Sequence, residues 1–115
     1  DENMQQRSEA ALSAQQDVDE AVTGFMRWLF GIRAARTLKR IREQSHGFEI
    51  DLTERALRRI QAGQNPEEVL RQLASTLTNK ILHLPSKRLR EAAEDQDYSV
   101  LRAADRIFRS EDEEE

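Results

Sequence analysis

The stretch LTNKILHLPSKRLREAA, residues 77–93, combines the period of an amphipathic helix with polar side chains on and beside its apolar face. Successive helical residues are 100° apart, so residues three and four apart share a face. At that spacing the apolar residues from Val69 to Leu84 form one arc. A neighbouring arc about 60° wide holds Gln72, Thr76, Asn79 and His83, which are polar but uncharged at neutral pH. The stretch therefore predicts a helix whose polar arc needs partners.

A polar arc that avoids charge beside an apolar arc is typical of a hydrogen-bonded packing seam. Each polar group buried without a partner costs about 1–3 kcal/mol, and a buried Asn can fix the register between helices. Lys80 lies within the apolar arc, so we expect it to extend to solvent or to pair with a carboxylate. The predicted seam, within the bundle or across a dimer, consists of Thr76, Asn79, Lys80, His83, Leu73, Leu77, Ile81 and Leu84. The alternative is that the polar residues are an uncharged part of the solvent-facing surface.

The composition favours association of the chain with itself. Of its 115 residues 37% are hydrophobic, below the roughly 45–50% of a typical globular domain, and 35% are charged. Such a chain builds long amphipathic helices whose apolar faces must be buried against one another or against a second copy. We therefore expect an all-α dimer.

The net charge, the cysteine content and the length of the apolar runs disfavour several classes of protein. The net charge of −4 is concentrated in the final EDEEE, which leaves residues 1–110 at +1 and predicts a disordered acidic tail at 110–115. No cysteine is present, which fits a reducing, cytoplasmic compartment. The sequence has no apolar run long enough to cross a membrane, so no membrane partner is expected.

The breakers divide the chain into five predicted helices. The first covers 1–30 and stops at Gly31, and the second runs from 34 to 62, continuous through Gly47. NPEE at 65–68 begins the third, with a capping Asn, a first-turn Pro and a Glu that can bond back to the cap, and Pro85 ends it. A fourth covers 86–94 and a fifth 97–108. The apolar faces of the first two helices hold Phe25, Trp28, Leu29, Leu38, Ile41, Leu52, Leu57 and Ile60. The predicted fold is a long N-terminal helix leading into a small helical bundle.

Four segments together resemble a known family. They are FMRWL at 25–29, ARTLKRIREQ at 35–44, LTERALRRI at 52–60 and LTNKILHLPSKRLREAAEDQD at 77–97. The combination is similar to the C-terminal dimerisation domain of glutamyl-tRNA reductases, and the resemblance covers nearly the whole chain. SHGFEID at 45–51 departs from it, because plain helix formers usually stand there.

The resemblance implies a function for each part of the chain. Residues 1–30 would be the end of a spinal helix, 31–109 a helical dimerisation domain and 110–115 the tail. The parent enzyme would use NADPH to reduce glutamyl-tRNA to glutamate-1-semialdehyde, the start of 5-aminolevulinate, porphyrin and haem synthesis. This part would hold the homodimer in a V shape, with NADPH bound by a domain outside it.

Catalytic chemistry is not expected in this chain. The resemblance implies a cysteine nucleophile and a glycine-rich phosphate loop, and the sequence has no cysteine and no G-x-G-x-x-G. Its two histidines are 37 positions apart without metal-site spacing. We therefore expect no catalytic, cofactor-binding or metal-binding residues.

Two other functions stay open. Residues 33–42 hold five cations, which would suit a helical tRNA-binding module, although together they spread round the helix and could form ordinary ion pairs. The chain could also be a helical adaptor for another protein. Binding of tRNA across a salt titration distinguishes the first alternative.

Overall fold

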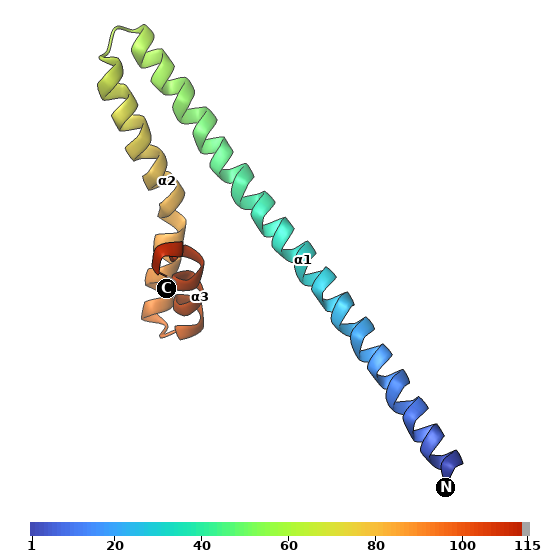
Figure 1. The fold of residues 1–115 in the computed structure, drawn as a ribbon. Helices are drawn as coiled ribbons and strands as arrows, with labels where there is room; N and C mark the ends of the chain where they lie inside the picture. Colours follow the sequence, from blue (N-terminus) through green and yellow to red (C-terminus); the bar gives the residue numbers. More distant parts are fainter. Residues whose placement is uncertain (114–115) are drawn as a thin grey trace. The chain divides into compact units, whose positions relative to one another are not determined.

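The computed structural model describes residues 1–113; Glu114 and Glu115, the end of the predicted acidic tail, lie outside the described residues. The elements are α1 (Glu2–Gln61), α2 (Pro66–Glu94), α3 (Tyr98–Phe108) and a single 3₁₀ turn, η1 (Glu111–Glu113) (Figure 1). This confirms the all-α class and the long first helix followed by a small bundle. The chain divides into two compact units, 1–43 and 44–115, and α1 contributes to both.

The prediction that the first helix ends at Gly31 is wrong, because α1 continues through Gly24, Gly31 and Gly47. A glycine that ends a helix takes a positive φ, and in the described residues only Gly63 among the glycines does so. Glycine inside a helix costs roughly 1 kcal/mol relative to alanine. That penalty is too small to stop a helix in which strong helix formers, Arg33, Ala34 and Ala35, follow Gly31 within four residues. The predicted continuity through 45–51 is confirmed.

The turn between α1 and α2 is the one that the sequence predicts. Gly63 has φ 93°, and the N–H groups of Gly63 and Gln64 donate to the carbonyls of Ile60 and Arg59 at 3.0 and 3.1 Å, a Schellman end. The Asn65 side chain then accepts from the Glu67 N–H at 2.9 Å, and Pro66 is the first residue of α2. The expected bond from Glu68 back to the cap is not formed among the residues that the structure describes.

The prediction that a helix ends at Pro85 is also wrong, because the expected third and fourth helices are the single helix α2. Proline lacks an N–H, so the interruption removes one intrahelical bond and introduces a clash, at a cost of about 3 kcal/mol. Pro85 is half-buried and lies beside Leu101 and Ala104 of α3. We attribute the continuity to this packing, which offsets part of the cost.

The helix α3 packs against the C-terminal half of α2 (Figure 1). The Asp97 N–H donates to the Ala92 carbonyl at 2.8 Å, and Gln96 takes a left-handed φ of 54°, which reverses the chain. The Asp97 carboxylate then caps α3, accepting from the Ser99 hydroxyl at 2.7 Å and from the Val100 N–H at 3.3 Å. The predicted helix 97–108 is confirmed to within one residue.

Acid should release this cap. The hydrogen bond from Ser99, and then that from the Val100 N–H, lower the pKa of Asp97 in the folded chain. A carboxylate with a lowered folded pKa stabilises the fold above its unfolded pKa, and this contribution is lost as pH falls through the folded value. We expect the start of α3 to fray below about pH 4. In Asp97→Asn, which keeps an acceptor but does not titrate, amide exchange at Val100 should be much less acid-sensitive. The same acid profile in both proteins would contradict this assignment.

Candidate self-association surface

The core of the second unit is small. Among the described residues only four hydrophobic side chains are buried: Leu52, Ala56, Val69 and Ala92. The chain exposes 10512 Å², whereas a compact monomer of 13.3 kDa would expose about 6,500 Å². Four buried side chains contribute at most about 1.5–3 kcal/mol each, against an ordering cost of about 1–2 kcal/mol for every residue of backbone. The described chain therefore needs further burial of apolar surface.

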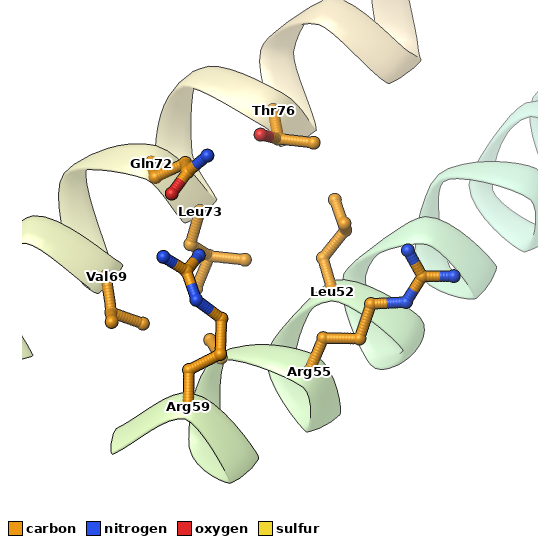
Figure 2. A pocket seen from close by; sticks show the side chains of 8 residues that line it. Leu52, Arg55, Arg59, Val69, Gln72, Leu73 and Thr76 are labelled. Carbon is orange, nitrogen blue, oxygen red and sulfur yellow. The ribbon is translucent and has the colours of Figure 1, made fainter. Parts of the chain in front are cut away.

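Three of the buried residues lie where the end of α1 meets the start of α2. Val69 is only 1% exposed, and it shares an open groove with Leu52 and Ala56 (Figure 2). Figure 2 shows the Arg59 side chain reaching from α1 toward Gln72 and Leu73 of α2, whereas the Arg55 side chain runs along α1. The residues of α2 that line it are Val69, Gln72, Leu73 and Thr76. The contact thus has an apolar base and a polar rim.

The four polar residues of the predicted seam line a second groove of about 420 Å³. Thr76, Asn79, Lys80 and His83 meet Phe48 of α1 there, and Thr76 lines both grooves. Thr76 and Phe48 are half-buried, whereas Asn79, Lys80 and His83 are exposed. Within residues 1–113 none of the four polar side chains has a hydrogen-bond or ion-pair partner, so the expected carboxylate for Lys80 is not supplied by this part of the chain. Burial of the seam stays a prediction about an assembly.

Of the apolar residues of the predicted seam, Leu73 faces α1, and Leu77, Ile81 and Leu84 lie beyond the α1 contact. Leu73 and Leu77 are half-buried, and Ile81 and Leu84 are 39% and 40% exposed. On a helical wheel Val69 and Leu73 face α1, and the polar seam lies to one side of them. To the other side lies an apolar strip of α2 that consists of Leu70, Leu77, Ile81 and Leu84. The helix α2 therefore presents two faces that residues 1–113 leave largely uncovered.

Most of the predicted apolar faces of α1 are likewise open. Leu52 is buried and Leu29 is half-buried. The others are exposed: Phe25, Trp28, Leu38, Ile41, Leu57 and Ile60. Phe25 and Trp28 contact each other, with ring centroids 5.8 Å apart, but Trp28 is still 61% exposed. The first unit is a single helix and has no core of its own.

The contact between α2 and α3 was not predicted from the sequence. Its apolar lining consists of Leu82, Pro85, Leu89, Leu101, Ala104 and Phe108. The signal was present, because Leu82, Pro85, Leu89 and Ala92 follow one another at intervals of three, four and three. Because Pro85 was predicted to end a helix, this three- and four-residue spacing was not followed across it.

Residues 1–113 show no cluster of three or more His, Cys, Asp or Glu side chains that could hold a metal ion. In the same residues no helix is both long and apolar enough to cross a membrane. The strongest feature of the described surface is thus its uncovered apolar area.

Comparison with known proteins agrees with this feature. The family described as glutamyl-tRNA(Glu) reductase, dimerisation domain, matches residues 13–110. The chain is 37% identical to the glutamyl-tRNA reductase of Methylococcus capsulatus over 112 residues, 97% of this chain and 27% of that protein. It is 42% identical to that of Alkalilimnicola ehrlichii over 93 residues, 81% of this chain and 21% of that protein.

The chain spans about a quarter of the length of these relatives. No solved structure matches it significantly. The family match covers both helices of the contact at Val69, the polar seam and α3. The chain therefore belongs to the family of glutamyl-tRNA reductase dimerisation domains.

Proposed function

We propose that the chain forms a homodimer through α2 and the end of α1, with the polar seam and the apolar strip of α2 in the interface. The observation that carries this proposal is the four-residue core beside two uncovered faces of one helix. A second copy can supply the missing apolar contacts, and a two-fold axis allows the same strips to serve both protomers.

We propose further that the chain serves an enzyme that reduces glutamyl-tRNA to glutamate-1-semialdehyde with NADPH, in the synthesis of tetrapyrroles. The names of the relatives support the first part of this proposal. The chain itself would be catalytically inert and would bind no NADPH, since its sequence has neither a cysteine nor a glycine-rich phosphate loop. Saturable heats on titration of the isolated chain with NADPH would contradict that part.

Sedimentation equilibrium tests the dimer directly. Interfaces of obligate homodimers commonly bury at least about 2,000 Å² in total, which predicts a folded dimer at micromolar concentration and unfolding coupled to dissociation. A well-folded monomer at that concentration would reject the proposed dimer, whatever the activity of the longer protein.

The polar seam should set how well the two copies pair. Asn79 is exposed in the single chain, so Asn79→Ala should leave the fold of each protomer intact. In the dimer the substitution leaves the former partners of the amide unpaired, at a cost of about 1–3 kcal/mol. Asn79→Leu should recover stability while the register becomes less specific. Denaturation at two protein concentrations, together with sedimentation, measures both effects.

Two results would show that the seam is ordinary surface. They are a change below about 0.5 kcal/mol for Asn79→Ala, and a dimer affinity equal to that of the unsubstituted chain.

A further inference from the structure

The first unit, residues 1–43, carries its charges in two separate blocks. Residues 1–24 have six acidic groups and one basic group. Residues 25–42 have six basic groups and no acidic group, and all six are exposed. They are Arg27, Arg33, Arg36, Lys39, Arg40 and Arg42.

Three of these arginines share one face of α1. Although the six cations together surround the helix, Arg33, Arg36 and Arg40 are three and four residues apart and lie within about 60° of one another. Their Cα atoms span about 10 Å along the axis at 1.5 Å per residue. Leu38 and Ile41 point away from this arginine row, so the row does not lie on the apolar face of the same segment.

None of the three arginines of the row forms an ion pair within residues 1–113. Positions three and four residues from Arg33 and from Arg36 hold apolar, threonine or basic residues. Glu43 is within reach of Arg40, but it pairs with Lys39 at 3.9 Å. Elsewhere in residues 1–113 arginines do pair along their helix, as Arg71 does with Glu67 at 2.7 Å.

Like charges three and four residues apart destabilise a helix, so the arginine row weakens α1 unless an anion neutralises it. Arginine presents a planar fork of donors that matches phosphate oxygens, and 15 of the 18 basic residues of this chain are arginine. We infer that Arg33, Arg36 and Arg40 bind the phosphate backbone of the tRNA on which the parent enzyme acts. The choice of RNA as partner rests on the proposed function, whereas the arginine row itself is independent of it.

Salt dependence of binding tests this inference. The probe is a transcript of glutamate tRNA, titrated with the 115-residue chain at several salt concentrations. Three phosphate contacts contribute about 2 to the slope of log K against log salt. The variant Arg33→Gln/Arg36→Gln/Arg40→Gln should lose about that slope and bind on the order of 50-fold more weakly at 0.15 M salt.

The matched control removes the same charge from ion-paired arginines. Arg71, Arg88 and Arg109 each pair with a carboxylate three or four residues away, so Arg71→Gln/Arg88→Gln/Arg109→Gln should bind within a few-fold of the unsubstituted chain. Equal losses in both variants would mean that only net charge matters, and absence of binding by the unsubstituted chain would reject the site. A variant of the arginine row that dissociates the dimer but still binds tRNA would show instead that the row faces a second copy. Sedimentation of each variant separates failure of the dimer from failure of the RNA site.

Discussion

Ile81→Asp should convert the dimer into a monomer at concentrations where the unsubstituted chain is fully dimeric. Ile81 lies in the apolar strip of α2 and is 39% exposed in the single chain, so the carboxylate can remain solvated in a monomer. In a dimer that covers the strip it would be buried. The residues three and four positions away are Leu77, Thr78, Leu84 and Pro85, and none can neutralise it. Burial of such a charge should weaken dimerisation on the order of 100-fold or more.

Thr78→Asp supplies the matched control. Thr78 is exposed, it lies between the two uncovered faces on the side of α2 away from α1, and it too has no basic residue three or four positions away. The same charge three residues from Ile81, outside the apolar strip, should weaken the dimer much less than Ile81→Asp does, as sedimentation equilibrium would show. If both substitutions weaken the dimer equally, or neither does, the apolar strip is not the interface.

Helical periodicity predicted most of the fold because it reports which residues share a face. It identified the helical class and the bounds of α3 to within one residue, and the capping residues of NPEE identified the Asn65 cap at the start of α2. The two predicted helix ends at Gly31 and Pro85 were wrong, because the local penalties of about 1 and 3 kcal/mol did not stop the helices there. Whether a glycine or proline ends a helix depends on its penalty relative to the stability of the flanking helical residues and their packing. The identity of the glycine or proline alone does not reveal that balance.

The candidate site was predictable only in part, for a physical reason. The wheel placed Thr76, Asn79 and His83 in one arc and Lys80 in the apolar arc beside it, and the structure brings all four into one groove with Phe48. The wheel could not show that Val69 and Leu73 pack against α1, because the face of α2 that contacts α1 depends on how the two helices pack. The burial of the seam depends on a second chain, which neither a helical wheel nor a single protomer contains.

Leu52→Ala should remove much of the stability of the second unit. Leu52 is 8% exposed and packs beside Ala56 and Val69 at the contact between α1 and α2. Loss of a buried leucine side chain removes its transfer free energy and leaves a cavity, which together cost about 2–4 kcal/mol. With only four buried hydrophobic side chains, the second unit has few other contacts to absorb that loss. Chemical denaturation followed by circular dichroism measures the change.

The control lies two residues away on the same helix. Ile50 is 47% exposed and points away from α2, so Ile50→Ala deletes a similar aliphatic group where little burial is lost. We expect its effect to stay below about 0.5 kcal/mol. Similar losses for Leu52→Ala and Ile50→Ala would mean that both faces of α1 are covered in the dimer. The interface would then include the face of α1 that points away from α2, so it could not be confined to the two faces of α2 and the adjoining side of α1.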